Sequence, residues 1–411
     1  MNRALRAAFF AAFLSSGTAG AAGTLFHSAP LTPLKTDAAF AAIADDAATR
    51  TADIVLADAS LVDPASATVH FALDIGGKVE LDAERLTSYR NADGTVVWHG
   101  RLAGLTDAKA ARLATDIADD PMNSVTLVRN GDKVTGNVRV QGQLYAVRPL
   151  HDGRHAIVEI DESKLPPDHD EAAYRHLFQQ RATLPVTVPA EAKANSVIRV
   201  LVNYTTAVNN AVADVPGLIN LAIAESNQGY ANSAVAITLQ LAGSGLVNYP
   251  ESSSFSTNLN RYLGTSDGYM DSIHAQRNSV AADVAVLLTA PGESCGIAPL
   301  NASASSAFSV SARNCATGNY TFAHEIGHNL GAHHDPAAGT NTIYPYGHGY
   351  VTPSQQWRTI MAYSTSCGGC QRLNSWSNPN KTYNGLPMGT ASKHDNARVL
   401  NQRAATVAAF R

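Results

Sequence analysis

The chain has 411 residues, of which 45% are hydrophobic and 16% charged, and its formal net charge is -4. This length exceeds what one ordinary domain needs and predicts two folded units, or a pro-segment followed by a catalytic domain. The small negative charge offers no basic surface, so neither nucleic acid nor an anionic membrane is an expected partner. We expect a soluble globular monomer.

The first residues have the order of a secretory signal peptide. Arg3 and Arg6 precede an apolar run over residues 7–14, and residues 19–21, Ala-Gly-Ala, fit a small-residue cleavage site. The apolar run is too short to span a bilayer, which argues against a retained membrane helix. The pattern predicts that residues 1–21 are removed and that the mature product is secreted, free in solution.

Residues 22–190 are predicted to be rich in β-strand. Short alternating segments recur there, separated by Asn-Gly and Asp-Gly pairs that favour hairpin turns. The clearest segments are Val125–Val128, Val134–Val138 and Ala156–Ile160. The polar, proline-containing stretch from Leu165 to Pro189 has the composition of a linker, which places the boundary between about Asp168 and Asn195.

Residues 191–411 are predicted to form an α/β unit. Ser196–Tyr204 is a nearly continuous apolar strand, and Leu218–Ala231 has the spacing of an amphipathic helix. Ile237–Leu241 and Val284–Leu288 are predicted as further strands, the second apolar enough to lie inside a sheet. The order strand, helix, strand favours a layer of helices against a sheet.

All four cysteines, Cys295, Cys315, Cys367 and Cys370, lie in this second unit. Export to an oxidising compartment favours disulfides over free thiols. Of the three connectivities, proximity along the chain favours Cys295 with Cys315 and Cys367 with Cys370, without excluding the others. A structural zinc held by four thiolates is the competing interpretation, weakened by the absence of a second C-x-x-C pair.

The segment HEIGHNLGAHHD, which begins at His324, matches the pattern HExxHxxGxxHD at every fixed position. Residues four apart on a helix project from one face, so His324 and His328 can reach a single ion, with Glu325 beside them. Gly331 allows the chain to leave the helix with a positive φ, after which His334 can supply a third nitrogen. The whole pattern would arise by chance with a probability on the order of one in ten thousand or less.

Three histidine nitrogens leave a fourth position open, as in catalytic zinc sites, where the ion lowers the pKa of a water. Glu325 is then the predicted general base, which takes a proton from that water and passes it to the leaving amine. The expected cofactor is one catalytic Zn²⁺, and the sequence leaves a structural Ca²⁺ undetermined. His333 misses the ligand spacing and is interpreted as a spare surface histidine.

These residues resemble the metzincin zinc metalloproteases, and Asp335 after the third histidine is similar to the adamalysin (reprolysin) branch. Thr359–Ser364 matches the metzincin Met-turn, which makes Met361 the apolar floor of the site, a role that hardly differs from ordinary core packing. Tyr363 is similar to the astacin and serralysin pattern. That similarity implies a phenol that ligates zinc or stabilises the oxyanion, with plain buried packing as the alternative.

The stretch from Cys295 to Gly389 resembles the bacterial peptidyl-Asp metalloendopeptidases. The resemblance implies a signal peptide, a propeptide and a catalytic domain with a twisted, mainly parallel sheet, an antiparallel edge strand, an active-site helix and a small C-terminal subdomain. It also implies protein or peptide substrates cleaved before Asp or other acidic residues. A cation should then line the substrate pocket, and Arg372 is the candidate, with a solvated arginine as the alternative.

The resemblance further implies that residues 22–190 are the enzyme's own inhibitor. They contain no cysteine, so inhibition must use a carboxylate, a histidine or steric cover rather than a thiolate on the zinc. Two alternatives remain: a permanent binding domain in residues 22–190, and a catalytically silent binding module with the metzincin fold. The intact Glu325 argues against the silent module.

Overall fold

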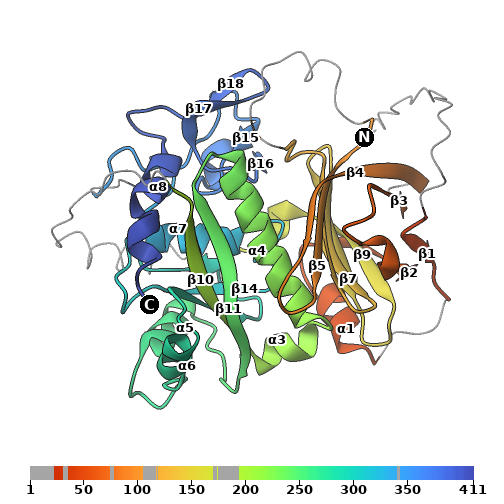
Figure 1. Cartoon of the computed structure of the whole chain (residues 1–411), viewed down its shortest axis with the longest axis horizontal. Coiled ribbons are helices and arrows are strands. Elements are labelled where there is room, and N and C mark those ends of the chain that lie inside the picture. Colours follow the sequence, from red (N-terminus) through yellow and green to blue (C-terminus); the bar gives the residue numbers. More distant parts are fainter. Residues whose placement is uncertain are drawn as a thin grey trace, which may run out of the picture.

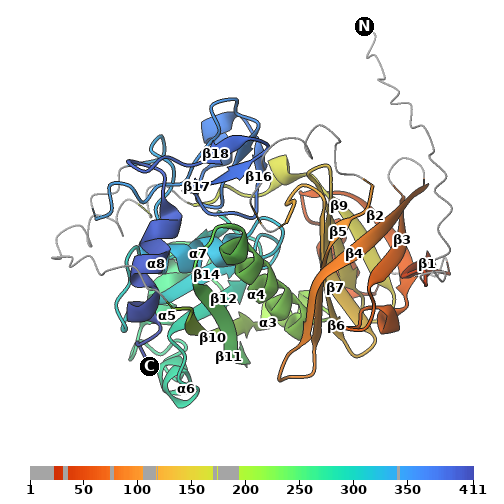
Figure 2. The same ribbon diagram turned by 45° about the horizontal axis from the view of Figure 1, so that its top comes forward.

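The chain folds into two units that lie side by side, a β-rich unit followed by an α/β unit (Figures 1 and 2). The computed structural model describes residues 23–30, 36–74, 78–104, 117, 119–169, 174, 194–339 and 343–411. The predicted signal peptide and most of the predicted linker lie outside these residues. The β-rich and α/β character predicted for the two units is confirmed.

The β-rich unit is one antiparallel sheet of nine strands in the order β1-β2-β9-β8-β7-β6-β5-β4-β3. An isolated bridge between Thr24 and His70 links the chain before β1 to β3, so the sheet nearly closes on itself. The strands are β1 (Phe26–Ser28), β2 (Thr49–Ala57), β3 (Thr68–Asp74), β4 (Lys78–Arg90), β5 (Val96–Leu102), β6 (Ser124–Asn130), β7 (Lys133–Val140), β8 (Gln143–Pro149) and β9 (His155–Ile160).

Apolar side chains at every second position of these strands fill the interior of the nearly closed sheet. Val125 and Leu127 on β6 pack with Val134 and Val138 on β7 and with Trp98 on β5, all fully buried. Side chains of one strand point alternately to opposite faces, so the apolar positions at every second residue meet inside. This is why the three segments read from the sequence as strands fall within β6, β7 and β9.

The α/β unit is built on a five-stranded sheet in the order β11-β10-β12-β14-β13, parallel except for the edge strand β13. This is the sheet implied by the resemblance. Its strands are β10 (Ser196–Thr205), β11 (Ile237–Val247), β12 (Val284–Thr289), β13 (Gly296–Ile297) and β14 (Phe308–Ala312). Every residue of β12 is buried, as expected for a central parallel strand covered on both faces.

Helices cover both faces of this sheet. Val284, Val286 and Leu288 on β12 belong to the core formed with α4 (Val215–Asn232), α7 (Thr321–Leu330) and α8 (Asn396–Val407). Ala285 and Leu287 belong to the opposite core, formed with α5 (Phe255–Leu263) and α6 (Ile273–Ser279). The short helix α3 (Thr206–Ala211) follows β10 directly.

After α7 the chain forms a small subdomain of short paired strands. Its elements are β15 (Trp357–Arg358), the 3₁₀ turn η4 (Ser364–Cys367), β16 (Gln371–Arg372), β17 (Asn378–Tyr383) and β18 (Leu386–Met388). β15 pairs in parallel with β16, and β17 pairs with β18 in antiparallel fashion. In the part of the chain that the structure describes, no helix is long and apolar enough to cross a membrane.

Buried polar contacts join the two units where β5, β6 and β7 lie against α4 (Figure 1). The Glu225 carboxylate on α4 accepts hydrogen bonds from Asn137 Nδ2 at 2.6 Å and from the Gly318 amide at 2.8 Å. Arg139 on β7 donates to the Gly318 carbonyl at 2.8 Å and to the Tyr320 hydroxyl at 3.1 Å. The β-rich unit is therefore docked on the segment that leads into α7.

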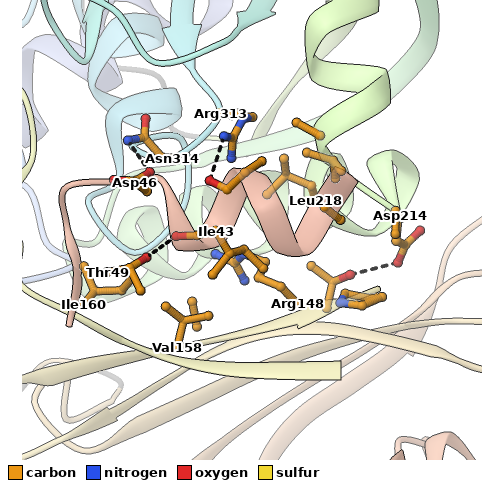
Figure 3. Close-up of a pocket in the computed structure, with 18 residues that line it drawn as sticks. Ile43, Asp46, Thr49, Arg148, Val158, Ile160, Asp214, Leu218, Arg313 and Asn314 are labelled. Atoms are coloured by element: carbon orange, nitrogen blue, oxygen red, sulfur yellow. Dashed lines mark hydrogen bonds between the residues drawn. The ribbon is translucent and has the colours of Figure 1, made fainter. Parts of the chain in front are cut away.

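A second contact is made by α1 (Ala38–Ala44), which lines a small, mainly apolar pocket between the units (Figure 3). Arg313 donates to the Ala42 carbonyl at 3.3 Å, and Asn314 donates to Asp46 at 2.9 Å. Both residues follow β14, so the helix of the β-rich unit rests on the loop that precedes the active-site helix.

Gly331→Ala should destabilise the chain, because Gly331 has φ +101° and a Cβ there would lie 2.8 Å from Tyr344 Cε2. The left-handed backbone costs about 1–2 kcal/mol and the overpacking about 1–3 kcal/mol more. Thermal and denaturant unfolding measure the loss. Gly268→Ala is the matched control, since Gly268 has φ +85° with nothing within 4 Å of its Cβ position. An equal loss in both variants would contradict the packing contribution.

Candidate metal centre and active site

Helix α7 places two histidines on one buried face. All ten of its residues are buried, and His324 and His328 lie one turn apart. His324 Nδ1 lies 3.0 Å from the Ile360 carbonyl oxygen, and His328 Nδ1 lies 2.8 Å from the Ala332 carbonyl oxygen. A proton on each Nδ1 satisfies these carbonyls and leaves both Nε2 lone pairs free to face a metal.

The third predicted ligand reaches the same point because α7 ends at Gly331 in the left-handed conformation. His334 Nε2 then lies 3.2 Å from His324 Nε2 and 2.9 Å from His328 Nε2. The structure thus brings together the three histidines that the spacing singles out.

A fourth histidine, which the sequence analysis missed, completes the cluster from the β-rich side. His169 Nε2 lies 3.0 Å from His328 Nε2, and the ligand atoms of His169, His324, His328 and His334 all lie within 4.8 Å of one another. His169 belongs to no spacing motif. The only signal for it was the inference that a histidine could be one of the inhibiting groups.

This donor set fits a metal cation. All four histidines are buried. Burial and the neighbouring positive groups lower the pKa values of His324, His328 and His334 well below that of an ordinary histidine. Neutral imidazoles whose acceptor nitrogens converge have no proton to share with one another, so a cation is what the geometry accommodates.

Glu325 lies beside the cluster with its carboxylate unsatisfied. It is fully buried, and neither carboxylate oxygen has a hydrogen-bond partner among the described residues. Burial, reinforced by the Asp168 carboxylate, raises the pKa of Glu325 well above its usual range. A buried carboxylate without hydrogen bonds is costly for a structural residue and is expected of a group that acts on a substrate or water.

The predicted Met-turn lies under the histidines. Met361 is fully buried in the core that also holds Ile326 of α7. The Asp335 carboxylate, directly after the third histidine, accepts a hydrogen bond from the Tyr363 amide at 2.9 Å. The centroids of the Tyr363 and His334 rings lie 4.2 Å apart. This contact is compatible with both predicted roles of Tyr363, as a group that acts at the metal and as a residue of the buried packing.

His333 is not the surface residue predicted from the sequence. It is only 2% exposed, and its ring lies 5.3 Å from that of His334 and 5.4 Å from that of His348. The chain turns back after Gly331, and the backbone at His333 pairs with the segment at His348. Burial, with the nearby His348, lowers the pKa of His333 to about 3.

Arg372 is also buried, so the alternative of a solvated arginine is wrong. Its side chain is 0% exposed, and Nη2 lies 2.6 Å from Asp168 Oδ2. Nη1 donates to the Asn319 carbonyl at 2.9 Å, and Nη2 also donates to the Ala362 carbonyl at 3.2 Å. The guanidinium is thus held next to the Met-turn and paired with a carboxylate from the β-rich side.

The first residues of the predicted linker pass through the site rather than through solvent. The Pro167 carbonyl accepts a hydrogen bond from the Cys295 amide at 2.8 Å, and the Asp168 carbonyl accepts one from the Gly296 amide at 3.2 Å. Edge strand β13 has unpaired amides on its free side, and the passing chain satisfies them. Residues 170–173 and 175–189 of the predicted linker lie outside the described residues.

Two disulfides border the site. Cys295 is bonded to Cys315, which ties the residue before β13 to the segment before α7, and Cys367 is bonded to Cys370, just before Arg372. This is the pairing favoured by proximity along the chain. With all four sulfurs in disulfides, the alternative of a four-thiolate zinc is wrong.

Comparison with known proteins agrees with this geometry. Residues 194–377 match metallo-peptidase family M12 (Reprolysin_5). A peptidyl-Asp metalloendopeptidase of Stenotrophomonas maltophilia (strain K279a) is 48% identical over 332 residues, 78% of each chain. One from Xanthomonas campestris pv. campestris is 43% identical over 412 residues, 96% of each chain.

The fold and the site therefore define a metallopeptidase. The chain belongs to the M12 reprolysin-like metallopeptidases and is a homologue of the bacterial peptidyl-Asp metalloendopeptidases.

Among solved structures, metalloproteinase-II from Bacteroides fragilis overlaps 65% of this chain and 81% of its own, with 13% identity and a TM-score of 0.34. A structure described as a chaperone–substrate complex overlaps 70% of this chain and 41% of its own, with 18% identity and a TM-score of 0.44. Both scores are too low to support a conclusion about function.

Gly296→Ala should impair catalysis while leaving the metal bound. A Cβ at Gly296 would lie 2.4 Å from Glu325 Oε1 and 2.8 Å from Thr321 Cγ2, so the carboxylate must move. A displacement of about 1 Å at a reacting group can cost about a hundredfold in rate, which kcat measured on a peptide substrate would report. Gly243→Ala, whose Cβ would meet nothing closer than 3.5 Å, should keep wild-type activity. Full activity in Gly296→Ala would contradict the assigned position of Glu325.

Proposed function

We propose that this chain is the precursor of a secreted, zinc-dependent endopeptidase that hydrolyses peptide bonds before Asp or other acidic residues. The observation that carries the proposal is the convergence of His324, His328 and His334 beside the Glu325 carboxylate, which accepts no hydrogen bond from the described residues. In this proposal residues 1–21 direct export, residues 22–190 are the propeptide, and residues 191–411 are a monomeric catalytic domain.

Zinc is the proposed ion because all the donors in the cluster are imidazole nitrogens. Mg²⁺ and Ca²⁺ prefer oxygen ligands, whereas Zn²⁺ takes imidazole in tetrahedral sites. His324, His328 and His334 would hold it. Bound zinc supplies a Lewis acid that polarises the scissile carbonyl and lowers the pKa of the attacking water.

Glu325 is proposed as the general base and acid. Its carboxylate takes a proton from the attacking water and delivers that proton to the departing amine nitrogen. Its place next to His324 and His328 on α7 puts the carboxylate beside the ligands that would hold the metal. Tyr363, packed against the third histidine, is proposed to stabilise the oxyanion, and Met361 to support the ligands from below.

The free edge of β13 is proposed to hold the substrate backbone. The amides of Cys295 and Gly296 donate to the carbonyls of Pro167 and Asp168 in this structure, and the backbone carbonyls of a substrate could accept hydrogen bonds from these amides instead. Such contacts fix the peptide without regard to its sequence, so the specificity must come from a side-chain pocket.

Arg372 is proposed as the residue that recognises the acidic side chain after the scissile bond. The relatives are named for action at Asp. In this chain the Arg372 guanidinium is buried and pairs with the carboxylate of an Asp, at 2.6 Å. A buried cation left without that carboxylate is unfavourable, so a substrate with a neutral side chain leaves an uncompensated charge.

Glu325→Gln should abolish peptide hydrolysis without releasing the metal. Loss of a general base typically costs about 10²–10⁴-fold in kcat, and Gln keeps the shape of the side chain. Hydrolysis of a fluorogenic peptide and the zinc content of the same sample are the measurements. Removal of zinc with a chelator should abolish wild-type activity reversibly. Activity retained in Glu325→Gln would refute the assignment of Glu325.

Arg372→Gln should lower kcat/KM for Asp peptides by about a hundredfold, while Asn analogues change little, because only the Asp side chain loses its charge partner. A peptide pair that differs only in Asp or Asn after the cut measures the ratio. Arg277→Gln is the matched control, since Arg277 is equally buried but lies next to Asp283. The Arg277→Gln substitution should lower the stability of the fold and leave the ratio of kcat/KM between the Asp and Asn peptides unchanged. An unchanged ratio in Arg372→Gln would exclude Arg372 as the specificity residue.

A further inference from the structure

We propose that Asp168 and His169 form an internal inhibitor, here called the 168–169 latch, which fills the acidic side-chain pocket and the fourth ligand position at once and runs in the opposite direction to a substrate. The inference rests on the proposed function, since it takes Arg372 as the substrate-binding cation. It explains how a propeptide without cysteine can block the site.

Asp168 occupies the place of the substrate's acidic side chain. Its own side chain is 10% exposed, and Oδ2 accepts a hydrogen bond from Arg372 Nη2 at 2.6 Å. Burial would raise the pKa of Asp168, but the charges of Arg372 and Arg358 outweigh that effect and hold the pKa below its usual value. The Asp168 carboxylate thus makes the contact with Arg372 that a bound substrate Asp would make.

His169 occupies the fourth position of the metal cluster with the same tautomer as the resident ligands. Its Nδ1 lies 2.7 Å from the Asp168 carbonyl oxygen, which calls for a proton on Nδ1 and leaves the Nε2 lone pair facing the cluster. His324 and His328 are arranged in the same way against the carbonyls of Ile360 and Ala332. A metal held by four imidazoles has no position left for water or substrate.

The direction of the latch follows from the order of its two groups. In a substrate cleaved before Asp, the carbonyl that meets the metal belongs to the residue preceding the Asp. In the latch, the group that meets the metal belongs to the residue following Asp168. Between the same two fixed points the latch therefore runs opposite to a substrate.

The backbone contacts keep a scissile bond away from the metal. Hydrogen bonds pair Pro167 with Cys295 and Asp168 with Gly296. The pairs follow the same order along both segments, so the two segments run parallel. The Asp168 carbonyl accepts two hydrogen bonds, one from the Gly296 amide and one from Nδ1 of the adjacent His169. That carbonyl is committed to these donors and does not face the metal, so the latch binds without presenting its peptide bond for attack.

The β-rich unit holds the latch in place. Glu162, seven residues before His169, pairs with Arg139 of β7 at 2.7 Å, and Arg139 also contacts Tyr320 at the start of α7. Because the latch is tethered to a docked domain, its effective concentration at the site is set by the tether, typically in the millimolar range for short links. Weak contacts at two points are then sufficient to keep the site closed.

The test uses the full chain carrying Glu325→Gln, which cannot process itself, with Co²⁺ in place of zinc. His169→Gln in this background should change the visible Co²⁺ spectrum, because one of four nitrogen ligands is lost. The pair Asp168→Asn with His169→Gln should bind a fluorescent Asp-containing peptide at least tenfold more tightly than the parent chain. His27→Gln and Asp132→Asn, at exposed positions of the β-rich unit, are the matched controls and should change neither readout.

An unchanged Co²⁺ spectrum in His169→Gln, or an unchanged peptide affinity in the double variant, would overturn the latch. If the double variant loses its fold by circular dichroism, the single variants carry the test. Hydrolysis by the full chain with Glu325 intact and with the Asp168→Asn and His169→Gln pair in place, in which the latch is removed, separates the two proposals. Cleavage before Asp together with unchanged spectra and affinity rejects the latch alone, whereas altered spectra and tighter binding without any cleavage reject the proposed function alone.

Discussion

The arrangement of the active site depends on one constraint: four buried imidazoles place their acceptor nitrogens within 4.8 Å of one another and cannot satisfy one another. A cation resolves this conflict, and the surrounding chain is built to keep the nitrogens aimed at it. The carbonyls of Ile360 and Ala332 orient two rings, and the left-handed Gly331 returns the third. Hydrogen bonds of this kind fix the tautomer and the direction of each imidazole ring. A metal site depends on both as much as on the identity of its ligands.

The sequence predicted the features that are formed by residues close together along the chain. His324, Glu325, His328, Gly331 and His334 lie within two turns of helix and one tight bend, so helical geometry alone relates their positions. The strands of the central sheet could be predicted equally well, because a strand buried on both faces must be apolar throughout. The disulfide between Cys367 and Cys370 belongs to the same class, since the two cysteines are separated by only 3 positions along the chain.

What could not be read depends on contacts between distant segments. His169 lies 159 residues before His328 and sits in a stretch whose composition resembles a linker. Only the docking of the β-rich unit on α4 and on the segment before α7 brings it to the metal site. The burial of His333 and the pairing of Arg372 with Asp168 have the same origin, because burial of a polar residue is decided by the tertiary neighbours that compensate it. Local pattern carries no information about such partners.

The interface between the units bears on how the latch could be released. It combines buried polar contacts, such as Asn137 with Glu225 and Arg139 with Tyr320, with a small apolar cluster in which Val97 and Val128 pack against Leu221 and Ala224 of α4. The buried polar pairs specify the geometry of docking but contribute little net stability. A single cut after His169 would turn an intramolecular contact into a bimolecular one and remove the effective concentration on which the latch depends. Dependence on the covalent tether thus suits a domain that must hold the site closed before the cut and leave the site afterwards.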